Sequence, residues 1–202
     1  MFRLPNAITI SRILLVPVFA VAFVLHGDAA RIVAFAIFCI AGLSDALDGL
    51  AARKLNAGSN FGRMLDPIAD KILVAVALMM LVAEGSIQQF NLEPSLASLL
   101  RLVPALIILT REILVSGLRE FLAGAAVSIP VTAVAKFKTT IQMIAIGAMI
   151  LEPLAKEHLP PALGVSYSAA AYIGLWVAAG LTVATGYIYF RSGLAYLRRS
   201  DA

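Results

Sequence analysis

The sequence has few of the features that build a water-soluble domain or a disulfide framework. Only 14% of its 202 residues are charged, whereas soluble domains average about 25%. Its one cysteine, Cys39, excludes a disulfide within the chain and a metal site built from several thiolates. Its two histidines, His26 and His158, are predicted to lie in connections far from the chain's acidic motif, so neither is a good candidate ligand or base. The chain also lacks low-complexity tracts, domain linkers and a convincing internal repeat.

Apolar residues dominate instead, at 61% of the chain. A membrane-spanning helix needs about 20 residues, so this length allows roughly six crossings with short connections. The candidate spans are residues 7–26, 29–52, 62–84, 97–120, 135–155 and 166–190. The sequence therefore predicts an all-α, polytopic membrane protein: one transmembrane domain over residues 1–202, built as a bundle of six transmembrane helices.

The basic residues are sorted to one side of this predicted bundle. With the N-terminus in the cytoplasm and six alternating spans, thirteen of the sixteen Lys and Arg residues lie on or near the cytoplasmic side, and only Arg31, Arg101 and Lys156 lie outside. This bias follows the positive-inside rule. It predicts that both termini are cytoplasmic and assigns the net charge of +4 to membrane orientation rather than to a nucleic-acid partner. Because no targeting segment is identified, we expect a bacterial inner (plasma) membrane.

Four aspartates interrupt the second and third spans. Asp45 and Asp48 are three residues apart, and Asp66 and Asp70 are four apart. Both spacings place side chains on one face of a helix. In antiparallel neighbouring helices the two pairs reach a similar depth, within about 12 Å of the cytoplasmic ends.

Four carboxylates in a partly dehydrated cavity repel one another unless positive charge neutralises them. All-oxygen ligands suit Mg²⁺ or Mn²⁺, and two such ions could hold a pyrophosphate between them. The alternative is neutralisation by lysines and arginines at the helix ends, without metal. The small residues between the aspartates allow a ligand to come close.

The segment DALDGLAAR, eight residues, then GRMLDPIAD is similar to the signature of the CDP-alcohol phosphatidyltransferase family, D-x-x-D-G-x-x-A-R followed after about eight residues by G-x-x-x-D-x-x-x-D. Every fixed position of that signature is present. The family's six helices, with the motif across the second and third, also match the predicted bundle. The resemblance implies an enzyme that transfers the phosphatidyl group of a CDP-linked lipid, commonly as a homodimer.

The same resemblance implies roles for the matching positions. Asp45, Asp48 and Asp66 would chiefly bind two Mg²⁺ or Mn²⁺ ions, while Asp70 would both touch metal and act as the general base. The residues implied to line the pocket for cytidine and its phosphates are Gly49, Ala52, Arg53 and Gly62.

Near the N-terminus, Asn6, Thr9 and Arg12 recur at intervals of three along the first predicted helix. By themselves they suggest helix capping and an arginine that extends to the interface. In similar family members this stretch borders the nucleotide, so the resemblance also implies that all three contribute to binding the CDP-lipid.

The fourth and fifth spans supply candidates for binding the acceptor. TREILVSGLREF and AVAKFKTT bring Arg111, Arg119, Lys136 and Lys138 to the cytoplasmic side. Arg111 lies well inside its span and requires an anionic partner. Glu112 projects from the adjoining helix face, so that partner stays open, and Glu112 could instead orient a basic residue.

Arginine and lysine together can bind a phosphate carried by the acceptor. TREILVSGLRE resembles the branch of the family whose acceptor is glycerol 3-phosphate. The predicted reaction takes CDP-diacylglycerol and glycerol 3-phosphate to phosphatidylglycerol phosphate and CMP, on the cytoplasmic face and among membrane lipids. The positive-inside rule alone also explains Arg119, Lys136 and Lys138.

Two other functions remain open from the sequence. The same chemistry could use serine, inositol phosphate or phosphatidylglycerol as the acceptor. The aspartates could instead form the pathway of a cation transporter, although transporters often place ions near the midplane between repeated halves. Trp176, Tyr187 and Tyr189 are predicted to contact lipid or to anchor the last helix at the interface.

Overall fold

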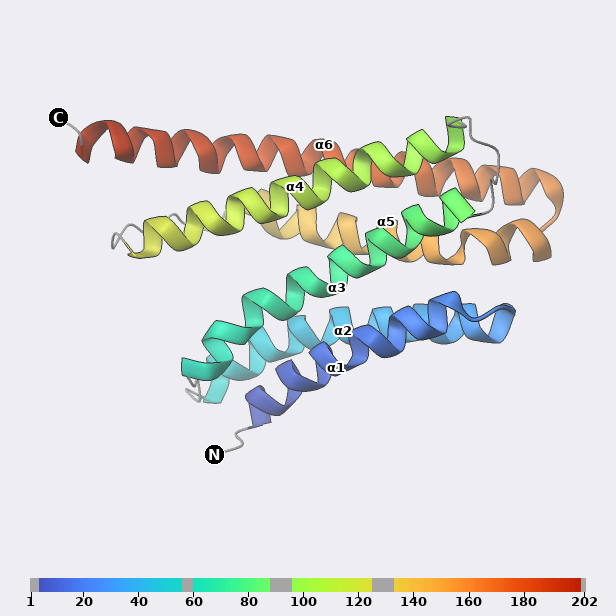
Figure 1. Ribbon diagram of the computed structural model, residues 1–202, viewed down its shortest axis with the longest axis horizontal. Helices are drawn as coiled ribbons and strands as arrows, with labels where there is room; N and C mark the ends of the chain where they lie inside the picture. The colour runs from blue at the N-terminus through green and yellow to red at the C-terminus, as the bar shows by residue number, and fades with distance from the viewer. Residues whose placement is uncertain (1–3, 56–59, 88–95, 125–132, 201–202) are drawn as a thin grey trace.

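The computed structural model describes residues 4–55, 60–87, 96–124 and 133–200, and all of these ranges are helical or form short connections (Figure 1). Within them, side chains are described for residues 9–44, 65, 68–69, 71–84, 99–124, 137–191 and 193–194. The helices are α1 Leu4–Val24, α2 Asp28–Leu55, α3 Asn60–Ile87, α4 Leu96–Gly124, α5 Ala133–His158 and α6 Pro161–Ser200. The six predicted spans are therefore all helical.

Successive helices run in opposite directions, so α1 begins and α6 ends toward the same end of the bundle, on the left of Figure 1. We call this the motif end, because α2 ends there and α3 begins there. The opposite end is called the far end. Two predicted connections are shorter than expected: α3 continues to Ile87, beyond its predicted span, and α5 and α6 are joined by Leu159 and Pro160 alone.

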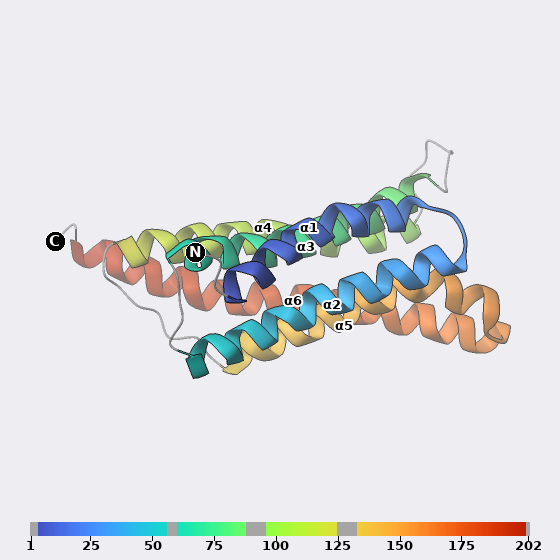
Figure 2. The ribbon, with the colours of Figure 1, turned by 90° about the horizontal axis from the view of Figure 1, so that it is seen from below.

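The first helix packs against both helices that carry the motif. α1 contacts α2 and α3 extensively, whereas α2 and α3 contact each other much less (Figure 2). On the other side of the bundle, α6 packs along α5 and α4, while α2 also packs on α5. The motif helices are consecutive in sequence, but α1 is the principal neighbour of both.

Large apolar side chains fill the centre of the bundle and also cover much of its outside. Phe19, Phe38 and Ile146 are almost completely buried, with the rings of Phe19 and Phe38 6.1 Å apart. Ile113 and Ile144 are two-thirds exposed. Among the described residues, only Pro161–Arg191 of α6 is both long and apolar enough by itself to cross a membrane, while Thr9–Val24 is a shorter apolar stretch.

Buried ion pairs join the helices near the far end. Arg31 of α2 pairs with Glu84 of α3, and the Arg101 Nη2 atom donates to Glu152 Oε2 of α5 at 3.2 Å. Lys156 pairs with the same glutamate. These three basic residues are the exceptions to the predicted charge sorting. Each has a carboxylate partner, so none is an uncompensated charge among apolar helices.

The turn between α1 and α2 depends on a glycine. Gly27 has a φ of +105°, which residues with a Cβ rarely adopt. Its carbonyl accepts a hydrogen bond from the Arg31 backbone N–H at 3.2 Å. α2 therefore begins at Asp28, the residue after Gly27, and Arg31 lies one turn inside the helix.

Candidate active site

The four motif aspartates occupy the adjoining ends of α2 and α3. Asp45 and Asp48 lie in the last part of α2, and Asp66 and Asp70 in the first part of α3. Both segments are α-helical, so the three- and four-residue spacings place each pair on one helix face. Their side chains lie outside the described set, as do those of Gly49, Ala52, Arg53 and Gly62. The backbone brings the two pairs to the same end of the bundle.

The polar residues of α1 are buried, which corrects part of the sequence interpretation. Thr9 and Arg12 are each 1% exposed. A fully buried guanidinium does not extend to the interface, so that interpretation of Arg12 is wrong. The capping interpretation is also wrong, because α1 begins at Leu4 and both Asn6 and Thr9 lie inside it. Asn6 has no described side chain.

A compact cluster of charged side chains bridges α4 and α5. Arg111 Nη1 donates to Glu112 Oε1 at 3.1 Å, and Lys138 Nζ of α5 donates to the same oxygen. The three side chains are 12%, 17% and 6% exposed for Arg111, Glu112 and Lys138. Glu112 is thus the anionic partner that Arg111 required, and it orients two basic residues at once.

The cluster lies beside the motif helix. α3 packs against both α4 and α5, and Lys71 of α3 adds a positive charge in the neighbourhood of Glu112. It directly follows Asp70 in the sequence. Arg111 and Lys138 are two cations paired with this one carboxylate, which leaves an excess of one positive charge among the three paired side chains. Such an excess attracts an anion.

Two of the four predicted acceptor-binding residues are brought together, and one is not. Arg111 and Lys138 share Glu112. Arg119 lies about 12 Å further along α4 than Arg111. Its side chain is exposed, and its guanidinium carbon lies 5.9 Å from the ring centroid of Tyr189 on α6. Lys136 lies in α5 with its side chain outside the described set. Arg119 therefore belongs to the surface rather than to the charge cluster.

The aromatic residues of α6 also include both exposed and buried side chains. Trp176 and Tyr187 are 40% and 65% exposed, as expected for outward-facing positions, but Tyr189 is only 4% exposed. The lipid-contact alternative is wrong for Tyr189, because its side chain is buried, with the guanidinium of Arg119 on one side of its ring.

Sequence reasoning did not identify several polar residues near the charge cluster. Thr185 of α6 accepts a hydrogen bond from Arg111 Nη2 at 3.0 Å and is 1% exposed. Gln142 lies one turn beyond Lys138 on α5, is 2% exposed, and its Oε1 has no partner among the described side chains. Lys71 was assigned only to membrane orientation. In the sequence, Thr185 and Gln142 stand out only as polar residues that interrupt apolar stretches.

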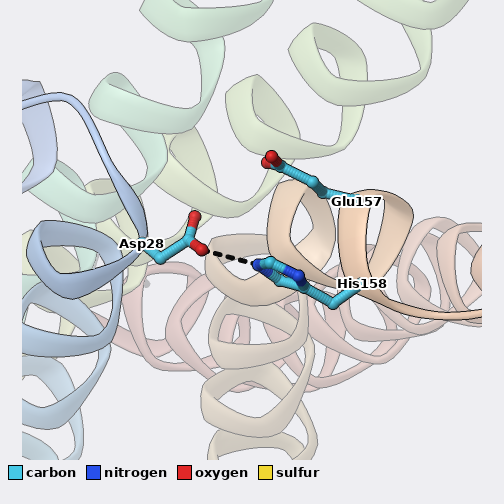
Figure 3. A group of neighbouring side chains, drawn as sticks. All are labelled: Asp28, Glu157 and His158. Atoms are coloured by element: carbon cyan, nitrogen blue, oxygen red, sulfur yellow. Dashed lines mark hydrogen bonds and ion pairs between the residues drawn. The ribbon is translucent and has the colours of Figure 1, made fainter.

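A second group of polar residues lies at the far end, well away from the motif. His158 Nε2 is 2.6 Å from Asp28 Oδ2, although both side chains are exposed to solvent (Figure 3). Together with Glu157 they form a group whose possible ligand atoms lie within 4.8 Å of one another. A cavity of about 510 Å³ adjoins Asp28 and Glu157. Asp28 lies about 25 Å along α2 from Asp45, so this exposed group cannot share ions with the motif aspartates.

The fold and these sites together define a helical, apolar bundle with paired aspartates at the adjoining ends of two helices. The family model for CDP-alcohol phosphatidyltransferases matches residues 2–184, nearly the whole chain. The chain belongs to the CDP-alcohol phosphatidyltransferase family, and it is an enzyme of that transferase type. The resemblance inferred from the motif is confirmed.

Two curated relatives match over almost their entire length. A protein from Rickettsia felis is 40% identical over 195 residues, which cover 96% of this chain and 97% of the relative. A protein from Bacillus subtilis is 37% identical over 213 residues, covering all of both chains. Both relatives are named CDP-diacylglycerol–glycerol-3-phosphate 3-phosphatidyltransferase.

Proposed function

We propose that this enzyme transfers the phosphatidyl group of CDP-diacylglycerol to glycerol 3-phosphate, giving phosphatidylglycerol phosphate and CMP. The observation that carries the choice of acceptor is the pairing of two basic residues, Arg111 and Lys138, with the single carboxylate of Glu112, beside the motif helix. The excess of positive charge favours an acceptor with a phosphate monoester, which carries about −1.5 to −2 at pH 7. Serine, which has no phosphate, leaves this charge uncompensated. The relatives' names agree with the same acceptor.

The motif aspartates are the proposed metal ligands. Family members generally depend on divalent metal ions. Asp45, Asp48, Asp66 and Asp70 offer only carboxylate oxygens, the donor type that Mg²⁺ and Mn²⁺ prefer, from two helix faces at one end of the bundle. They would hold two ions. When bound, these ions supply positive charge that neutralises the pyrophosphate and stabilises the departing oxygen.

Asp70 is the proposed general base. It accepts the proton from the primary hydroxyl of glycerol 3-phosphate, the hydroxyl oxygen forms a bond to the lipid-linked phosphorus, and the bond from that phosphorus to CMP breaks. Arg53 offers a positive charge to the CMP phosphate as it leaves. Gly49, Ala52 and Gly62 leave space for the cytidine, while Asn6, Thr9 and Arg12 of α1 border the CDP-lipid. The packing of α1 against both motif helices supports this last assignment.

The proposed enzyme crosses a bacterial inner membrane six times as a homodimer, with both termini and the active site in the cytoplasm. The motif end carries most of the basic residues, as the positive-inside rule requires. Its apolar exterior faces lipid, where the acyl chains of CDP-diacylglycerol reside. Glycerol 3-phosphate enters from the aqueous side.

We expect the purified full-length enzyme to release CMP from CDP-diacylglycerol when Mg²⁺ or Mn²⁺ and glycerol 3-phosphate are supplied. Serine, inositol phosphate and phosphatidylglycerol, tested as acceptors at equal concentration, should give little CMP. Omission of the metal, with EDTA present, is the control for metal dependence. Faster release with another acceptor would reject glycerol 3-phosphate while retaining the family's reaction.

A further inference from the structure

The last helix carries none of the motif and none of the proposed acceptor-binding residues, yet it contacts Arg111 directly. Arg111 Nη2 donates to Thr185 Oγ1 at 3.0 Å. The same Oγ1 lies 2.9 Å from the Leu181 carbonyl oxygen and 3.1 Å from that of Thr182. A hydroxyl has one proton, which it donates to a carbonyl of its own helix, so a lone pair remains to accept from Arg111.

The next residue on α6 provides space for the arginine stem. A Cβ added at Gly186 would lie 2.9 Å from Arg111 Cγ and 3.2 Å from its Nε. Real Cβ atoms do not approach carbon this closely, so even alanine at Gly186 would displace the Arg111 side chain. Arg111 thus lies directly on the backbone of α6 at this glycine.

We propose that Thr185 and Gly186 are positioning residues that hold Arg111 in the orientation that binds the phosphate of the acceptor. This inference rests on the proposed role of Arg111 in acceptor binding. Glu112 fixes one terminal nitrogen of Arg111 and Thr185 fixes the other. Because a guanidinium is planar, two such anchors set the plane of the group.

The anchored guanidinium keeps donors for a ligand. Arg111 Nε has no hydrogen-bond partner among the described residues, and each terminal nitrogen has a second proton. A phosphate oxygen can accept these protons with the bidentate geometry that arginine offers. Selection of phosphorylated acceptors therefore depends on α6 as well as on the helices that carry the basic side chains.

The test is steady-state kinetics of full-length Thr185→Val and Thr185→Ser in detergent, with CMP release as the readout. Valine keeps the shape of threonine but removes the oxygen that accepts from Arg111, and a hydrogen bond to a charged group corresponds to a change on the order of tenfold or more in affinity. We expect Thr185→Val to raise KM for glycerol 3-phosphate roughly tenfold, with KM for CDP-diacylglycerol unchanged. Serine retains the hydroxyl and should restore the wild-type KM. Gly186→Ala should raise the same KM by displacing Arg111.

Two matched controls lie on the same helix. Thr182→Val changes another fully buried threonine, whose Oγ1 has no partner among the described residues, and Gly180→Ala adds a methyl group where nothing lies within 4 Å. Both should keep the wild-type KM for glycerol 3-phosphate. Thermal midpoints of all variants separate a loss of folding from a loss of positioning.

Arg111→Ala distinguishes failure of the inference from failure of the proposed function. If Arg111→Ala raises KM for glycerol 3-phosphate while folded Thr185→Val and Gly186→Ala do not, Arg111 binds the acceptor without help from α6 and the inference is overturned. If Arg111→Ala leaves that KM unchanged, the acceptor role of Arg111 itself is wrong. An equal rise in KM for both substrates would also contradict a role specific to the acceptor.

Discussion

Arg111 and its neighbours illustrate what a single side chain needs inside an apolar helix. The sequence indicates that Arg111 requires an anion, because an uncompensated charge there is costly. It does not identify Glu112, since consecutive residues on a helix project about 100° apart. The long arginine side chain nevertheless reaches Glu112 Oε1 at 3.1 Å while its other terminal nitrogen reaches Thr185 on α6. The requirement was predictable, but the partners were not.

At the same scale, Asp70→Asn tests the proposed base. Asparagine is close in shape to aspartate but cannot accept the proton from the acceptor hydroxyl at neutral pH. We expect CMP release to fall by at least about 100-fold, the lower range for general-base catalysis, while the affinity for CDP-diacylglycerol is largely kept. Rates from CMP release and binding of labelled CDP-diacylglycerol measure the two effects. Near-normal turnover would remove Asp70 from the mechanism.

At the scale of helices, the far end is joined by ion pairs, whereas the motif end carries the proposed ligand sites. Glu152 of α5 is 1% exposed and receives both Arg101 of α4 and Lys156 of its own helix. Arg101 Nε also donates to the Tyr172 hydroxyl of α6 at 2.8 Å. Side chains of three helices therefore meet at one buried ion pair near the far end.

Glu152→Ala should destabilise the bundle without altering the active site. Removing this carboxylate leaves the buried Arg101 without its close anion, because its other contact, Glu84 Oε2, is 3.8 Å away. The expected loss is about 3–5 kcal/mol, the range for breaking a buried pair on one side, measured as a lower thermal midpoint in detergent. KM values of the folded enzyme should not change.

Lys156→Ala provides the contrasting variant. Lys156 pairs with the same Glu152, but its side chain is 53% exposed. An exposed ion pair contributes roughly 0–1 kcal/mol, so its thermal midpoint should stay close to that of the wild type. Equal effects of the Glu152 and Lys156 substitutions would show that burial does not decide the strength of these pairs.

For the whole molecule, the alternating helices place the motif end and the far end on opposite sides of the proposed membrane. Labelling with an impermeant thiol reagent tests this orientation in a Cys39→Ala background. We expect Leu159→Cys, in the exposed α5–α6 connection, to react in intact spheroplasts. Ala123→Cys, exposed near the end of α4, should react only after the membrane is opened. The reverse pattern would place the active site outside the cytoplasm.

The sequence by itself determined the family, the six helices and the end of the bundle that carries the motif. The aspartate spacing, the glycines and the sorting of Lys and Arg are local patterns, and each has a local physical cause. Helix lengths were close, although α6 runs from Pro161 to Ser200 and exceeds its predicted span at both ends. The spacing of Asp45, Asp48, Asp66 and Asp70 was therefore enough to make them candidate metal ligands.

Only the tertiary structure decided how the helices are rotated and which side chains meet between them. Core and outer faces of this bundle are both apolar, as Ile146 and Ile144 illustrate, so hydrophobicity does not indicate which face points inward. The burial of Arg12, the link from Glu112 to Lys138 and the position of Thr185 under Arg111 all depend on that rotation. Contacts between helices far apart in the sequence therefore became known only from the packed structure.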